Sequence, residues 1–411
     1  MSQARTTAVW PQVAALLPDW VGDADALAAR LEVDRAELEH ICTVAKQQSA
    51  THLLQTAKVA RAKALLHAAQ ASLSAIAADC GFSSKAAMDR CLTANVGVDS
   101  AGWRASRGAK QLTARLPKRF RRDETLNYLG RDKHSTSVRR GGNDTFAIAW
   151  LHAGRALTMQ LSFHHHDVAI SLQGVRGRVP DGAAPAALEL VARLLGTHSP
   201  AADFEQRAAV EPLVHRLTRG RRGLRISLTH TAFDAIVWSI IGQQVSLPFA
   251  YQMLRSASEL CGAPAPGGLK TMPVPATLAE LAPDRLMAFK FSRAKAQYLT
   301  AAARAVSEGQ LRIPATIEDT AEEVYTALIS QRGLGPWSVN YIMMRGLGFA
   351  DCVPLGDAGL RRALSAFLDS GEAPDSQRMA AVMEPFKPHR SLATFHLWRW
   401  LDLPNTVQLT A

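Results

Sequence analysis

The chain has 411 residues, 47% of them hydrophobic, and its 47 lysines and arginines against 36 aspartates and glutamates give a net charge of +11. This length and apolar content exclude disorder over most of the chain and predict several domains with cores of their own. No stretch approaches the ~18 uninterrupted apolar residues of a membrane helix, and the N-terminus lacks the apolar core of a signal peptide, so we expect a soluble, cytoplasmic protein that has no membrane partner.

Residues 20–105 have the pattern of short helices joined by polar turns, rich in Ala and Leu and with almost no strand signal. Within them, residues 73–90 have the form of a helix-turn-helix motif. Its first helix ends at Gly81, where a positive φ costs little, and Ser83 and Ser84 can cap the second helix.

The second helix of this motif carries Lys85 and Arg90, which we expect to contact DNA. An earlier segment, 25–40, has a similar form, but its second helix is acidic and would repel phosphates. This layout resembles the AraC-type double helix-turn-helix domain of bacterial regulators, which we assign to residues 20–108 after an extension over 1–19. A helical domain without any DNA contact is the alternative.

Most of the positive charge lies in one run between Arg104 and Arg140, which holds twelve basic and three acidic residues. A second cluster of five arginines lies between Arg216 and Arg225. Such blocks are either solvated linkers or nucleic-acid contacts, so the charge needs a motif before it indicates DNA.

Residues 143–173 change to the two-residue period of strands, which predicts a small antiparallel sheet, followed by a helix over 184–195. The strands are expected at 145–152, 156–163 and 168–174. Three adjacent histidines, 164–166, fall in a turn and would alternate faces, so zinc is not expected there. The five cysteines are scattered singly, which argues against zinc and iron–sulfur sites elsewhere. We assign residues 112–200 to this α+β domain.

Residues 205–405 have the pattern of helices joined by short loops. Between two of these helices, Gly333 and Gly335 enclose the apolar Leu334, which is the form of a helix-hairpin-helix. The glycines let backbone N–H groups approach a phosphate, and the next helix begins at Pro336 with its positive end towards the anion. We expect this tip to bind DNA.

A loop rich in Gly and Pro, residues 346–357 (the Gly/Pro loop), follows and places Asp357 just before the next helix. Here the chain resembles the helix-hairpin-helix, Gly/Pro loop, Asp superfamily of DNA base-excision glycosylases, and within it the AlkA-type 3-methyladenine glycosylases, over roughly residues 112–402. Three further stretches agree with that family: 233–246, 291–296 and 387–398. The fold class implied is multidomain and mostly α, with a helix-hairpin-helix glycosylase fold, a small antiparallel α+β domain and the N-terminal helix-turn-helix domain.

The resemblance makes Asp357 the catalytic residue, because cleavage of an N-glycosidic bond builds positive charge on the sugar that a nearby carboxylate stabilises. Without the motif, helix capping would be the favoured interpretation of this residue. Family members that also cut the strand have an amine nucleophile where this chain has Trp337, and tryptophan cannot form a Schiff base. We therefore expect water as the nucleophile and an abasic site as the product.

Trp337, Tyr341 and Trp398 match aromatic positions of the family's base pocket, and Tyr128 aligns with another. Such rings attract cationic alkylated purines through cation–π interactions. Where the family often has a further aromatic, this chain has Arg399. The resemblance thus implies a monofunctional glycosylase that flips and excises bases of the 3-methyladenine and 7-methylguanine class from double-stranded DNA in base-excision repair.

The same resemblance assigns Gln243, Gln244 and Ser246 to a loop that enters DNA, with Gln244 as the side chain that fills the hole left by the flipped base. It also implies a structural Na+ or K+ bound by backbone carbonyls near Gln331 and Gly333, and no other cofactor.

Two alternatives remain open. One is a DNA-binding regulator of the alkylation response with weak or no turnover, which the family departures at Lys290, where Gly is usual, and at Arg399 leave open. The other is a glycosylase for a different damaged base, such as hypoxanthine. For the favoured glycosylase interpretation we expect a monomer at the bacterial nucleoid, with an N-terminal domain that adds non-specific DNA affinity rather than reading an operator.

Overall fold

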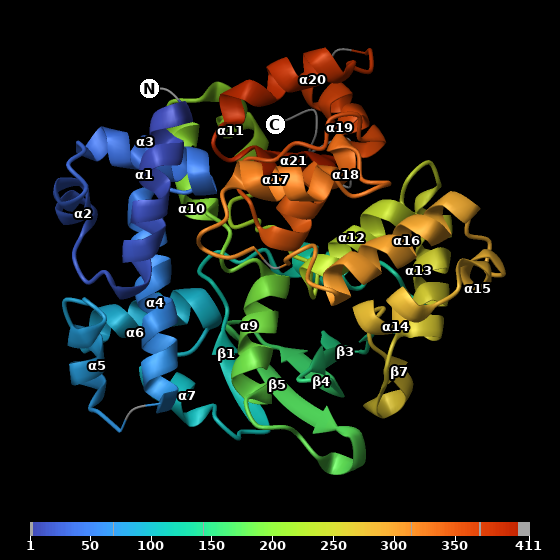
Figure 1. The fold of residues 1–411 in the computed structure, drawn as a ribbon, viewed down its shortest axis with the longest axis horizontal. Coiled ribbons are helices and arrows are strands. Elements are labelled where there is room, and N and C mark those ends of the chain that lie inside the picture. The colour runs from blue at the N-terminus through green and yellow to red at the C-terminus, as the bar shows by residue number, and fades with distance from the viewer. Residues whose placement is uncertain (1–2, 69, 143, 314, 370, 402–411) are drawn as a thin grey trace.

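The computed structural model describes residues 3–401 apart from residues 69, 143, 314 and 370 (Figure 1). Helices α1–α7 form one side of the molecule, the sheet β1–β5 lies beside their lower part, and helices α10–α21 make up the remainder. This agrees with the predicted fold class. The first two residues of the predicted extension, and residues 402–405 of the predicted last domain, lie outside the described residues.

The N-terminal helices follow the predicted double helix-turn-helix order. The elements are α2 (Ala24–Arg30), α3 (Arg35–Lys46), α4 (Ala50–Ala68), α5 (Leu73–Asp79), α6 (Lys85–Val96) and α7 (Ser100–Ala105). As expected, the chain turns at Gly81 with a φ of +73°. Ser84 caps α6, because its Oγ accepts a hydrogen bond of 3.1 Å from the N–H of Ala87.

The cores of this part do not follow the predicted domain limits. The extension forms a helix, α1 (Gln3–Leu16), and its Trp10 is buried in one core with the first motif. The second motif instead shares a core with the sheet, since Leu92 belongs to the same buried cluster as Phe146. The boundary predicted between residues 108 and 112 therefore lies inside a continuous core.

The sheet is antiparallel, with strand order β1-β5-β4-β3-β2. Its inner strands β3 (Thr145–His152), β4 (Arg155–Phe163) and β5 (Asp167–Gly174) are the three predicted ones, and the predicted helix is α9 (Ala183–Leu195). The edge strands β1 (Gln111–Arg115) and β2 (Val138–Arg140) were not predicted. Their polar and basic sequences lack the apolar alternation that marks an inner strand.

The basic run is folded rather than a solvated linker. It forms β1, α8 (Arg122–Leu129) and β2, and several of its arginines have partners within the protein. Arg121 pairs with Glu124 at 2.7 Å, and Arg139 donates a hydrogen bond of 3.0 Å to the carbonyl of Gly267. Part of the net charge therefore stabilises the fold itself.

Residues 201–401, which we call the C-terminal helical body, pack around α12 (Ala232–Ile241), in which every side chain except that of Trp238 is buried. The small strands β6 (Pro264–Ala265) and β7 (Leu269–Lys270) form a ribbon beside β3 and β4. The other α-helices of the body are α10 (Ala201–Gln206), α11 (Pro212–Thr218), α13 (Leu247–Cys261), α14 (Pro275–Glu280), α15 (Pro283–Met287), α16 (Arg293–Ser307), α17 (Ala321–Ile329), α18 (Pro336–Ile342), α19 (Ala358–Leu368), α20 (Ser376–Met383) and α21 (Arg390–Trp400). A π-helical turn, Met343–Leu347, follows α18.

A contact that includes a histidine joins the second helix-turn-helix motif to the segment that follows α9. The side-chain amide of Asn95 lies 3.1 Å from Nδ1 of His198, and Thr197 donates a hydrogen bond of 2.7 Å to the carbonyl of Asn95. Partial burial of the ring lowers the pKa of His198 below its ordinary 6.5, and solvent at the exposed part of the ring limits the shift. The folded protein therefore keeps this ring neutral at a pH where the unfolded chain binds a proton.

We expect stability to fall as the pH decreases from about 6.5 towards 4, because the unfolded state binds more protons there. Burial raises the pKa of Asp234 to about 6, so this group opposes the trend between pH 4 and 6. The contribution of His198 is therefore measured by comparing a His198 variant with the wild type. Because the His198 side chain is exposed and solvent screens its charge, His198→Asn should make the acid loss shallower by at most about 0.5 kcal/mol. Thermal denaturation of both proteins at pH 7 and pH 5 measures this, and an equal loss in both would contradict the assignment to His198.

Candidate active site

The helix-hairpin-helix lies between α17 and α18, as predicted. Gly333 has a φ of +92°, and a Cβ there would lie 2.3 Å from the ring of Tyr298, so both its conformation and its close packing require glycine. Gly335 is the N-cap of α18, and Pro336 is the first residue of that helix. Leu334 is buried, which anchors the exposed tip.

The predicted DNA-entering loop is bonded to this hairpin. Gln243 donates hydrogen bonds from Nε2 to the carbonyl of Gly333 at 2.8 Å and to Oγ of Ser338 at 3.2 Å. Lys295, in the stretch that resembles the family's lysine-alanine helix, donates to the carbonyls of Ile241 and Gln243 at 2.6 and 2.7 Å. Both predicted DNA-binding segments are thus held in one rigid arrangement.

Gln244 projects from the loop that these bonds hold. It is exposed and has a φ of +54°, an uncommon conformation for a side-chain-bearing residue. Ser246, also exposed, is the N-cap of α13, and the neighbouring Leu247 is 56% exposed. The loop therefore presents the polar side chains of Gln244 and Ser246 and the apolar side chain of Leu247 to solvent.

Asp357 is the N-cap of α19, and its Oδ1 accepts a hydrogen bond of 2.7 Å from the N–H of Leu360. The capping interpretation is therefore correct, but it is incomplete. The indole N–H of Trp398 also donates to Oδ1 at 2.9 Å, and the indole N–H of Trp337 donates to Oδ2 at 3.1 Å. Three donors from three elements fix the orientation of the carboxylate.

A cavity of about 1240 Å³ opens in front of this carboxylate, between α8, the loop before α13, and helices α18, α19 and α21. The predicted site residues that line it are Asp357, Trp337, Tyr341, Trp398, Tyr128, Gln243, Gln244 and Ser246. The ring of Tyr341 stacks on that of Trp337, with centroids 5.6 Å apart, and lies 6.2 Å from that of Trp398. The sequence-predicted carboxylate and aromatic residues therefore share one pocket.

The sequence did not indicate Arg131 and Arg362, which line this pocket, or the buried Arg345, which lies against Tyr128. The guanidinium of Arg131 lies 3.9 Å from the ring centre of Tyr128, and that of the buried Arg345 donates a hydrogen bond to the Tyr128 hydroxyl. Burial alone would raise the pKa of this hydroxyl, but the charges of Arg131 and Arg345 outweigh burial and lower it. Tyr128 lies in the pocket wall, as predicted, with its ring already in contact with a cation.

One signal could have indicated Arg131, because it directly follows the C-terminal end of α8, where a cation is favourable. Arg345 follows an apolar segment and carries no such signal. Three aromatic residues, Trp238, Tyr251 and Phe395, also line the pocket without having been predicted.

The remaining predicted DNA contacts lie apart from this pocket, on α6. Arg90 is exposed, whereas Lys85 forms an ion pair of 2.6 Å with Asp89. In the first motif, the acidic residues of α3 have partners within the N-terminal part, since Glu37 pairs with Arg5 at 2.7 Å.

The family departure at Lys290 has a structural consequence. Lys290 is exposed and has a φ of +68°, in the left-handed region that glycine adopts without strain. Lys290→Gly should therefore raise the free energy of unfolding by about 0.5–1 kcal/mol, less than the full left-handed penalty because glycine loses more chain entropy on folding. Denaturant titration measures this, with Lys290→Ala, which keeps the strain, as the matched control. Equal stability of the Gly and Ala variants would contradict the explanation.

The carbonyls near the hairpin are compatible with the predicted monovalent cation. Those of Gln331 and Gly333 each accept one hydrogen bond, from the N–H of Leu334 and from Gln243, and each retains a lone pair. Among the residues that the structure describes, no group of three or more His, Cys, Asp or Glu side chains could hold a metal ion. The five cysteines are all free.

Comparison with known protein families gives two matches. Residues 237–388 match the model described as "HhH-GPD superfamily base excision DNA repair protein", and residues 27–106 match a helix-turn-helix domain. In the described part of the chain, none of the helices has the length and apolar character needed to cross a bilayer.

Relatives and solved structures agree with the first match. A DNA-3-methyladenine glycosylase of Bacillus subtilis is 25% identical over 70% of this chain and 95% of its own length. DNA-3-methyladenine glycosylase 2 of Escherichia coli is 31% identical over 44% of this chain and 62% of its own length. The solved 3-methyladenine DNA-glycosylase from Archaeoglobus fulgidus shares the fold, with a TM-score of 0.60 and 20% identity over 70% of this chain and 96% of that one.

Proposed function

Residues 237–388 belong to the HhH-GPD superfamily of base-excision DNA repair proteins, and from this premise we propose that the chain is a monofunctional glycosylase that excises alkylated bases from double-stranded DNA. The class of base proposed is that of 3-methyladenine and 7-methylguanine. The observation that carries the proposal is the Asp357 carboxylate, held by two indole N–H donors at the wall of an aromatic pocket.

The geometry suits hydrolysis of an N-glycosidic bond. As the bond between C1′ and the base breaks, its electron pair leaves with the cationic base and neutralises it, and positive charge develops on the sugar. The Asp357 carboxylate would stabilise that charge, and water would bond to C1′ and release a proton. By the family resemblance, Trp337 stands where strand-cutting members have their amine nucleophile, so no covalent adduct would form and an abasic site would remain.

Three features would bind and open the duplex. The hairpin tip would present its N–H groups to a phosphate, and the carbonyls of Gln331 and Gly333 would hold a Na+ or K+ whose positive charge attracts the DNA backbone. Gln244 would enter the stack in place of the flipped base. We propose that a monomer does this in the bacterial cytoplasm, at the nucleoid.

The experiment is a base-release assay on duplexes that each carry one modified base. We expect release of 7-methylguanine, a cation that the rings of Trp337 and Trp398 attract, in preference to hypoxanthine, which is neutral. Preferential release of hypoxanthine would instead favour a glycosylase for that neutral base, to which the arginines at the pocket would supply polar contacts.

The helix-turn-helix match supports a second role in DNA binding. We propose that α6, with the exposed Arg90, adds sequence-independent affinity, because α3 contributes acidic side chains. A footprint confined to one promoter sequence and persisting at moderate salt would instead indicate a transcriptional regulator.

A further inference from the structure

Gln47, a residue of the helix-turn-helix domain, hydrogen-bonds to the Gly/Pro loop. Gln47 is the C-cap of α3 and adopts the left-handed conformation, with a φ of +56°. Its Oε1 accepts a hydrogen bond of 2.7 Å from the backbone N–H of Asp351 and lies 3.8 Å from Sγ of Cys352. A residue of the N-terminal domain is thus bonded to the loop that ends at Asp357.

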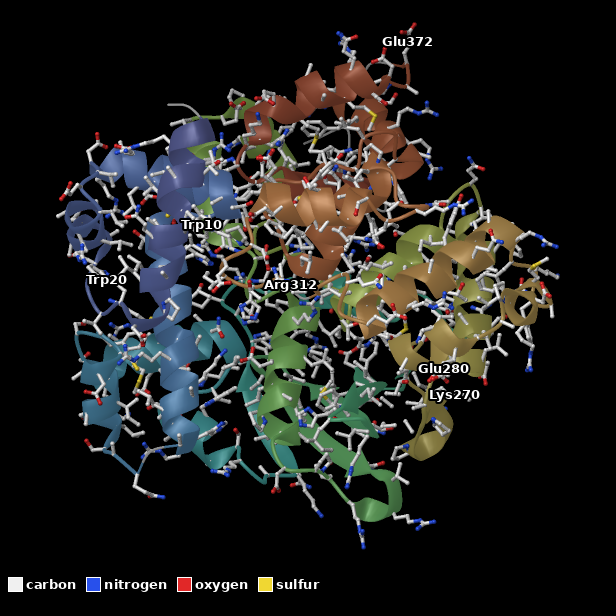
Figure 2. All side chains as sticks on the ribbon, viewed as in Figure 1. Trp10, Trp20, Lys270, Glu280, Arg312 and Glu372 are labelled. Atoms are coloured by element: carbon white, nitrogen blue, oxygen red, sulfur yellow. The ribbon has the colours of Figure 1, made fainter. Side chains whose placement is uncertain are left out.

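Separate bonds fix the docking of this domain. Lys46 donates from Nζ to the carbonyls of Thr316 and Asp319 at 2.8 and 2.6 Å. Trp10, labelled in Figure 2 on the side of α1 that faces the C-terminal helical body, donates from its indole to the carbonyl of Glu318 at 2.9 Å. These bonds end on the segment before α17, whereas the hydrogen bond of Gln47 ends on the Gly/Pro loop.

The other bonds to the start of this loop come from the C-terminal helical body. The carboxylate of Asp351 is bidentate to Arg390, with both N···O distances 2.7 Å. Ser391 Oγ donates to the carbonyl of Phe349 at 2.7 Å, and Asn340 accepts from the N–H of Val353 at 3.2 Å. Arg390 begins α21, which also carries Trp398, so the start of the loop and one donor to Asp357 are mechanically joined.

We propose that Gln47 is a positioning residue for base excision. It fixes the start of the Gly/Pro loop and, through the loop, the carboxylate of Asp357. Loss of its acceptor leaves the N–H of Asp351 unpaired, which is costly in a largely buried segment, and the loop relaxes to satisfy it. A small displacement of a reacting group lowers the rate without weakening DNA binding. A residue of the helix-turn-helix domain thereby helps to position the catalytic carboxylate. This inference rests on the proposed glycosylase function.

The test compares variants of the full chain. Gln47→Met keeps the side-chain length but has no oxygen acceptor, Gln47→Glu keeps an acceptor, and both retain the same left-handed backbone. Lys46→Met is the matched control, because it removes bonds of the same interface that do not reach the loop. Single-turnover release of 7-methylguanine, the Kd for DNA and the thermal midpoint are measured for each.

We expect Gln47→Met to release the base about five- to tenfold more slowly at unchanged Kd, with Gln47→Glu and Lys46→Met within about twofold of the wild type. If the wild type is active and Gln47→Met releases the base at the same rate, this inference is wrong while the proposed function stands. Equal losses in Gln47→Met and Lys46→Met would also overturn it, since the effect would then belong to domain docking in general. A wild type that releases no base would remove the proposed function as well.

Discussion

Asp357→Asn should lower the single-turnover rate of base release by about 10²- to 10⁴-fold, with DNA affinity almost unchanged. Asparagine has nearly the shape of aspartate but brings no charge to the sugar in the transition state. Its amide can accept from only one of the two indole donors, because its nitrogen is itself a donor. The loss is therefore specific to the chemical step.

The double role of Asp357 makes this variant informative. Asparagine caps helices about as well as aspartate, so α19 should keep its first turn and the thermal midpoint should change little. Release measured at saturating protein, together with DNA affinity and thermal denaturation, separates the two roles. Release at the wild-type rate would show that Asp357 only caps a helix.

Trp398→Phe should lower the rate of release by about tenfold, while Trp398→Ala should lower it by about 100-fold and also weaken discrimination between a cationic base and a neutral one. Phenylalanine keeps an aromatic face beside Tyr341 but lacks the N–H that donates a hydrogen bond of 2.9 Å to Asp357. Alanine removes the face as well.

The comparison of the two variants separates orientation of the carboxylate from stacking of the base. We expect the ratio of 7-methylguanine to hypoxanthine release to stay near the wild-type value for Trp398→Phe and to fall for Trp398→Ala. Wild-type rates for Trp398→Phe would mean that the indole bond to Asp357 has no catalytic effect.

The parts of the site that were predictable from the sequence are those with local signatures. Gly333 and Gly335 mark the hairpin in the sequence, with Gly333 at a positive φ, and Asp357 follows a loop whose Gly and Pro content is visible in a few residues. The inner strands were predictable because each is a short segment bounded by turn residues, with alternating apolar residues in β5 and a nearly continuous apolar run in β3.

The parts that could not be predicted depend on contacts between distant residues. Arg345 is buried against Tyr128, 217 positions away, and nothing near either residue indicates the pair. Gln47 and Asp351 lie 304 positions apart, and a single hydrogen bond leaves no periodic pattern. Such bonds determine how one domain docks on another, and they could be identified only from the structure.

The most direct test of the proposed chemistry is the product that the full chain makes from duplex DNA with a single 7-methylguanine. We expect free 7-methylguanine and an unbroken strand that breaks only after alkali, with no protein–DNA adduct trapped by borohydride, because Trp337 supplies no amine. Failure to release the base would contradict the proposed excision and the role of Asp357 in it. A strand break with a trapped adduct would contradict the assignment of water as the nucleophile.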